Sequence, residues 1–187
     1  KRLLQGFLDI ELNDEGKKQA KKLAERLKNH NIEIMFVSPL KRSMQTAEQI
    51  KKFHPKAKVI IDEDLKEINF GIFEGLSKEE IKKKYAEMYE EREKDKFNYR
   101  SPEGESLADV EKRAIKMLDK VLKTKKDSII VAHGTLNILF FKNLMKKSYD
   151  EIKKHKYNNT SVSIFNIEEN DVFVDEFNCD KHLKNSL

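Results

Sequence analysis

Apolar residues recur every three or four positions in four segments of the chain, which is the spacing of an amphipathic helix. Each segment begins with a residue that can cap a helix, namely Asn13, Ser38 (with a proline next to it for the first turn), Ser77 or Ser106. The last two have an acid three positions later, as in a capping box. We therefore expect helices with these inward-facing residues: Ala20, Leu23, Ala24 and Leu27; Leu40, Met44, Ala47 and Ile50; Ile81, Tyr85 and Met88; Leu107, Val110, Ala114, Met117 and Val121.

Short apolar runs lie between these helices and predict strands over residues 32–37, 59–61, 128–132, 161–167 and 172–177, the last two as a hairpin around Asn170 and Asp171. The run 128–132 carries no charge, which favours a central parallel strand covered on both faces. The nearly all-apolar segment Leu136–Leu144 predicts a buried helix. Alternating strands and helices predict an α/β three-layer sandwich, with a mostly parallel central sheet and helices on both faces.

Composition narrows the partners that we expect. The 187 residues suit one domain, and the net charge of +5 comes from lysines interleaved with glutamates. A nucleic-acid footprint would need clustered Lys and Arg with aromatic platforms, so we expect no nucleic-acid partner, whereas a small anionic substrate fits. Cys179 is the one cysteine, so no internal disulfide can form, which agrees with a cytoplasmic protein. No apolar window reaches about 18 residues, so we expect no membrane partner.

Three strand ends carry candidate chemistry, because ligands of open α/β sheets bind beyond the carboxyl ends of the strands. Arg42 follows one strand in a helical first turn, where its guanidinium fork and free N–H groups suit a phosphate; alone, it also fits a surface arginine. Glu67 follows another strand, where a partly buried acid can protonate a departing alkoxide. His133 ends the uncharged run and can donate to a phosphoryl group, although a structural histidine is the alternative. Gly134 permits a tight turn there. Glu74 is a weaker candidate acid, and the histidine spacing matches no metal site.

Taken together, six segments in order resemble the histidine phosphatase (phosphoglycerate-mutase-like) superfamily: residues 4–16, 38–47, 65–75, 102–113, 131–134, and 158–161 with 182–183. The resemblance implies that Arg42 clamps a phosphoryl group, Glu67 acts as the acid and then as the base, and His133 is the second histidine of the site. It also implies substrate contacts at Gln5, Gly6, Gly134 and Thr135, with neither metal nor cofactor.

The family's nucleophile is a histidine in an Arg-His-Gly loop, and no such tripeptide occurs in these 187 residues. We therefore expect residues 1–187 to form a single histidine phosphatase domain that lacks its first strand and catalytic loop, with the nucleophile upstream of Lys1. The alternative is a truncated form, which we expect to be unstable and inactive.

The resemblance implies a compact phosphomonoesterase, similar to the α-ribazole phosphatase type, that binds a small phosphorylated metabolite or inorganic phosphate and reacts through phosphohistidine. A cofactor-dependent phosphoglycerate mutase and a catalytically inactive phosphate-binding module are the alternatives. Residues 77–100 are expected to roof the site and select the substrate, unless they form only an amphipathic helix with a loop. A homodimer is compatible with the sequence.

Overall fold

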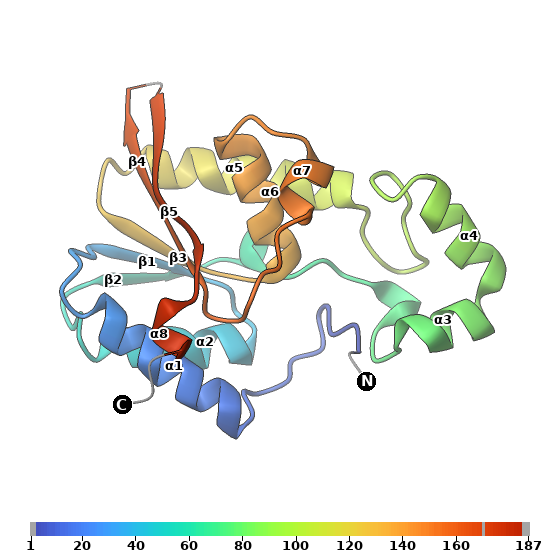
Figure 1. Ribbon diagram of the computed structural model, residues 1–187, viewed down its shortest axis with the longest axis horizontal. Helices are drawn as coiled ribbons and strands as arrows, with labels where there is room; N and C mark the ends of the chain where they lie inside the picture. The colour runs from blue at the N-terminus through green and yellow to red at the C-terminus, as the bar shows by residue number, and fades with distance from the viewer. Residues whose placement is uncertain (1–2, 170, 185–187) are drawn as a thin grey trace.

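The computed structural model describes residues 3–169 and 171–184 (Figure 1). Helices and strands alternate through most of the chain, as the hydrophobic pattern predicts. Their bounds are α1 Asp14–Leu27, β1 Ile34–Val37, α2 Lys41–Lys51, β2 Lys58–Ile61, α3 Lys78–Lys84, α4 Ala86–Lys94, α5 Leu107–Leu122, β3 Ser128–Val131, α6 Gly134–Leu144, α7 Tyr149–Lys153, β4 Val162–Glu168, β5 Asp171–Cys179 and α8 Lys181–Lys184. None of the helices in the described ranges is both long enough and apolar enough to cross a membrane.

Three parallel strands form the sheet at the centre of the fold, in the order β2-β1-β3. Their carboxyl ends are aligned, because Val37 of β1 is in register with Ile61 of β2 and with Val131 of β3. All four residues of β1 are buried, whereas in β3 only Val131 is. The expectation that residues 128–132 form the central strand is therefore wrong for the described sheet, where β3 lies at an edge, although its alternate side chains do pack against cores on both faces. An uncharged run shows that a strand has apolar neighbours, but it does not tell which strand has a partner on either side.

Helices cover both faces of this sheet. Alternate side chains of β1 point to opposite faces, so each face contributes to its own core. Ile34 and Phe36 enter a core formed with α5 and α6. Met35 and Val37 enter a second core, formed with α1 and α2. The expected three-layer α/β architecture is thus present, and Figure 1 shows α5 and α6 on one side of the sheet and α1 and α2 on the other.

The last two strands, β4 and β5, form an antiparallel hairpin that is not hydrogen-bonded to the parallel sheet within the described residues. This confirms the expected hairpin, although its turn residue Asn170 lies outside the described residues. The start of β4 lies near β3, since Val162 packs against the core cluster that contains Val131. In Figure 1 the hairpin rises above the body of the molecule.

Capping explains where most helices begin. Asn13 accepts from the Gly16 N–H, and Ser77 and Ser106 form the predicted capping boxes with Glu80 and Asp109. The prediction that Ser38 caps the second helix is wrong. That helix begins at Lys41, whose N–H donates to the side chain of Asp9 instead.

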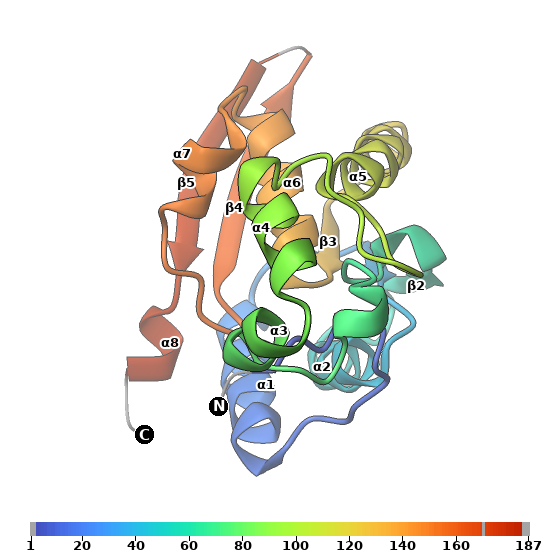
Figure 2. The ribbon, with the colours of Figure 1, turned by 90° about the vertical axis from the view of Figure 1, so that its right-hand side faces the viewer.

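The expected helix from Ser77 to Met88 is interrupted at Tyr85. The backbone of Tyr85 has φ −132° and ψ 50°, which ends α3 and starts α4. Figure 2 shows both helices in front of the rest of the molecule, on the side toward which the carboxyl ends of the parallel strands point.

Candidate active site

Arg42, Glu67 and His133 come from three different segments and meet at the carboxyl-terminal edge of the parallel sheet. Arg42 is the second residue of α2, His133 immediately precedes α6, and Glu67 lies in the loop that follows β2. The guanidinium of Arg42 bonds to the His133 ring, and the negative charge of Glu67 acts on Arg42. The structure therefore brings together the three side chains that the sequence singled out.

Arg42 is the hub of this cluster. Its Nε donates to His133 Nδ1 at 3.3 Å, its Nη1 to the Leu8 carbonyl at 2.8 Å, and its Nη2 to the Gly6 carbonyl at 2.8 Å. A guanidinium has five N–H groups, so one on each Nη has no acceptor among the described residues. Half-burial lowers the pKa of Arg42, and nearby carboxylates, with Glu67 first, oppose that shift. Arginine nevertheless keeps its charge in proteins, and a guanidinium with N–H groups to spare suits an anion such as a phosphoryl group.

His133 is neutral in this setting. It is 7% exposed, and its pKa is lowered to about 3 by burial and then by the charges of Arg42 and Arg113. Because Nδ1 accepts from Arg42, the ring proton sits on Nε2, which donates to Ser38 Oγ at 2.7 Å. Ser43 Oγ lies 3.2 Å from the same Nε2. Both ring nitrogens are thus engaged, and the positive charge at this point comes from Arg42.

Glu67 is held at the N-terminus of α6. Its Oε2 accepts from the Thr135 N–H at 3.2 Å, and its Oε1 from the N–H of Ile68 at 2.9 Å. Backbone N–H groups at a helix start favour a negative group, which explains why the carboxylate settles there. Gly134 is exposed beside it, and a Cβ at that position would lie 3.8 Å from Glu67 Oε2. In this arrangement the Thr135 N–H, which we expected at a substrate contact, donates to Glu67.

Residues 5–9 close one side of the cluster. Gly6 is buried with φ +51°, and a Cβ there would lie only 2.1 Å from Glu74 Oε1. That same oxygen accepts from the backbone N–H groups of Phe7 at 2.7 Å and Phe70 at 3.2 Å. Glu74 therefore ties two loops together, while Gln5 is exposed at the edge of the cluster.

Several contacts of the site have no clear signal in the sequence, although Glu105 and Arg113 lie in one of the six segments that resemble the family. Arg113 of α5 fixes the loop that carries Glu67: its Nη1 donates to the carbonyls of Asp64 and Lys66, and its Nη2 to the Glu67 carbonyl at 2.9 Å. Glu105 neutralises it through two contacts near 3 Å. Ser38 and Ser43 orient His133. Their hydroxyl groups alone do not reveal a partner that lies 95 and 90 positions away, respectively.

Outside this cluster, the other histidines have separate surroundings. His54 is buried against the Leu27 carbonyl, and His182 bonds to Arg26 near the C-terminus. His30 and His155 are exposed. Within the described ranges, no three His, Cys, Asp or Glu side chains gather as ligands of a metal would.

Comparison with known proteins adds to this geometry. The family model for "Histidine phosphatase superfamily (branch 1)" matches residues 1–180. The chain belongs to the histidine phosphatase superfamily. Two relatives of this family have sequences similar to most of the chain. Phosphoglycerate mutase-like protein 4 of Arabidopsis thaliana is 33% identical over 175 residues, which cover 91% of this chain and 74% of the relative. Phosphoserine phosphatase 1 of Hydrogenobacter thermophilus is 30% identical over 181 residues, which cover 96% of this chain and 85% of the relative.

Solved structures of this superfamily confirm the fold. Phosphoserine phosphatase from Entamoeba histolytica, in complex with 3-phosphoglyceric acid, has a TM-score of 0.80 at 28% identity and covers 97% of this chain and 90% of its own. The α-ribazole phosphatase from Shigella flexneri has a TM-score of 0.87 at 20% identity, and the match covers 95% of this chain and 88% of that protein. The likeness to the second shows the shared fold alone. The resemblance inferred from the six segments, and the phosphoglycerate-mutase-like α/β fold that it implied, are therefore confirmed.

Proposed function

We propose that this histidine phosphatase hydrolyses a small phosphorylated metabolite as a phosphomonoesterase, through a phosphohistidine intermediate. The observation that carries the proposal is the convergence of Arg42, Glu67 and His133, with two N–H groups of Arg42 left for phosphoryl oxygens. Relatives named as phosphoserine phosphatases support hydrolysis of such esters.

In the proposed first step, a histidine nitrogen attacks phosphorus and the ester P–O bond breaks. Arg42 balances the charge of the phosphoryl oxygens, and Glu67, which takes up a proton from solvent when the phosphate ester binds, gives that proton to the departing alcohol oxygen. In the second step Glu67 takes a proton from water, the water oxygen bonds to phosphorus and the P–N bond breaks, which returns the histidine and releases phosphate. The contacts at Gln5, Gly6, Gly134 and Thr135 would border the substrate. Neutral His133 orients Arg42 in this scheme.

The attacking histidine in this proposal precedes Lys1, and residues 1–187 belong to one domain with it. His133 is a poor candidate for the attack, since both of its ring nitrogens are engaged. Two strand edges support the placement: within the described residues β3 has no partner on the side away from β1, and β4 pairs only with β5. A strand between them would pair with both edges and end beside Arg42.

The test uses the protein extended upstream of Lys1. We expect release of phosphate from an aryl phosphate and an acid-labile phosphohistidine on the enzyme. Arg42→Ala or His133→Ala should lower turnover by at least ~100-fold, the scale of losing one oriented charge-stabilising group. Lys52→Ala, an exposed change at the far end of the same helix, serves as the control.

Two results would replace this proposal by its alternatives. Isomerisation of 3-phosphoglycerate, primed by a bisphosphoglycerate and faster than phosphate release, would identify a mutase. The relative named phosphoglycerate mutase-like protein 4 makes that assay worthwhile. Phosphate binding with neither turnover nor phosphohistidine would identify an inactive binding module.

A further inference from the structure

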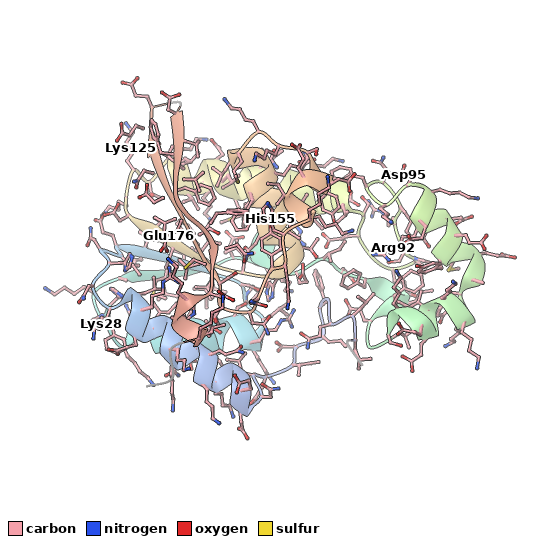
Figure 3. All side chains as sticks on the ribbon, viewed as in Figure 1. Lys28, Arg92, Asp95, Lys125, His155 and Glu176 are labelled. Atoms are coloured by element: carbon pink, nitrogen blue, oxygen red, sulfur yellow. The ribbon has the colours of Figure 1, made fainter. Side chains whose placement is uncertain are left out.

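The segment 3–12 is a surface loop that borders the candidate active site. Figure 3 shows it crossing from the side of α3 to the start of α1, and Leu8 and Asp9 within it are exposed. This segment contains no helix, and its one strand-like contact is the isolated bridge between Leu3 and Ser77. Its path beside the active site therefore depends on a few individual contacts.

Contacts with the first turn of α2 hold this loop in place. Two consecutive loop residues, Leu8 and Asp9, meet two consecutive residues of the helix. The Asp9 carboxylate accepts from the Lys41 N–H at 2.7 Å, and the Leu8 carbonyl accepts from Arg42 Nη1 at 2.8 Å. The Gly6 carbonyl accepts from Nη2 of the same arginine at 2.8 Å. The loop and the guanidinium thus orient each other, and Asp9 joins the loop to the backbone of the helix.

Asp9 supplies the cap that the sequence of α2 lacks. The N-cap position of this helix is Leu40, whose side chain forms no capping bond, and the first turn of the helix has no acidic residue. The free N–H groups at a helix start stabilise a carboxylate, and so does the helix dipole. Asp9 brings that carboxylate from 32 positions away, and its negative charge also acts on Arg42. The capping bond therefore decides where the neighbouring loop carbonyls stand relative to the arginine.

We propose that Asp9 is a positioning residue for the reaction, because it docks the loop on α2 and thereby orients the guanidinium of Arg42. The inference rests on the proposed function, in which Arg42 balances the charge of the phosphoryl oxygens. Without the capping bond, the carbonyls of Gly6 and Leu8 are no longer held at their places beside the guanidinium. Arg42 then regains rotamers, which have to be restricted again each time a substrate binds.

The experiment uses the protein extended upstream of Lys1 and measures kcat/KM for an aryl phosphate. Asp9→Ala should lower kcat/KM by ~10-fold, less than the ~100-fold expected for loss of Arg42 itself, since His133 still binds Nε. Asp9→Asn should keep kcat/KM within ~3-fold of the unmodified enzyme, because asparagine and aspartate are comparable N-caps. The Arg42 Nε–H signal in ¹⁵N NMR spectra, identified by its loss in Arg42→Ala, should shift in Asp9→Ala and stay in place in Asp9→Asn.

Asn13→Ala is the matched control, because Asn13 caps α1 through the Gly16 N–H at 2.8 Å. Both alanine variants should lower the equilibrium constant of folding, measured in urea, by about 5-fold, the scale of losing one N-cap. Asn13→Ala should nevertheless keep kcat/KM within ~2-fold, as a surface change away from the reaction does.

Three results would overturn the proposed role of Asp9. They are an unchanged kcat/KM in Asp9→Ala, an equal loss in Asn13→Ala, and an Arg42 signal that does not move when Asp9 is replaced by alanine. If the unmodified enzyme cleaves no phosphate ester, it is the proposed function that fails, whereas the Arg42 signal still reports whether Asp9 orients the guanidinium.

Discussion

Acidification should destabilise this protein through His133. The pKa of that ring is about 3 in the folded chain against a usual value of 6.5, so the unfolded state binds the proton more readily. The sign follows: stability is intact above pH 6.5 and is lost as the pH falls from 6.5 toward 3. Each unit of difference corresponds to about 1.4 kcal/mol. Between pH 7.5 and 5.0 the unfolded ring gains most of a proton and the folded ring almost none. His133 alone should therefore lower the free energy of unfolding by roughly 2 kcal/mol over this range.

Urea unfolding at pH 7.5 and pH 5.0 measures this term, for the unmodified protein and for His133→Gln. A glutamine is uncharged at both pH values and can still accept from Arg42 and donate to Ser38. We expect the unmodified protein to lose ~2 kcal/mol more of its free energy of unfolding than the variant does. Equal losses, within ~0.5 kcal/mol, would refute a buried neutral imidazole, as would His133 ring resonances that titrate between pH 7.5 and 5.0 in NMR spectra of the folded protein.

Two further predictions concern the loops that position the site, and both are checked by the free energy of unfolding. Gly71→Ala should cost about 2–5 kcal/mol, because Gly71 has φ +55° and a Cβ would lie 2.0 Å from the Pro102 carbonyl oxygen. Gly75→Ala should cost only about 1–2 kcal/mol, since its φ is +78° but its nearest contact would be 3.8 Å away; equal costs would contradict the clash. Arg113→Gln should cost about 3–5 kcal/mol by leaving Glu105 and three carbonyls without their donor. Lys116→Gln, which loses only an exposed pair with Asp64, should cost under ~1 kcal/mol, and a similar cost for both would show that Arg113 does not fix the loop.

Local rules predicted most of the helices and strands. Asn13, Ser77 and Ser106 begin helices because each side chain accepts the backbone N–H three positions ahead, a contact that depends only on nearby sequence. Ser38 has the same chemistry, yet it caps nothing, because its hydroxyl bonds to His133 and a distant carboxylate, Asp9, takes the first N–H of α2. Local preference was overridden where a contact between distant residues was better.

The candidate site could be predicted as a set of residues but not as a network. The position of Arg42, Glu67 and His133 after strands was enough to place them at one edge of a parallel sheet. The sequence does not show that Arg113 holds the Glu67 loop, because the two lie 46 positions apart and the bond is to a carbonyl group, which every residue possesses. Nor does it show the charge of His133, which depends on burial and on the cations that surround it in the folded chain.

The neutrality of His133 changes how the site would handle charge. An imidazolium beside Arg42 would place two cations in contact, at a cost that rises as water is excluded. A neutral ring that accepts from Nε avoids this cost and also fixes the guanidinium plane, while one N–H on each Nη keeps no acceptor among the described residues. The carbonyls of Gly6 and Leu8 hold the same plane from the other side. A phosphoryl group would therefore meet a single cation whose orientation is already set, and the free energy of its binding would not be reduced by ordering that side chain.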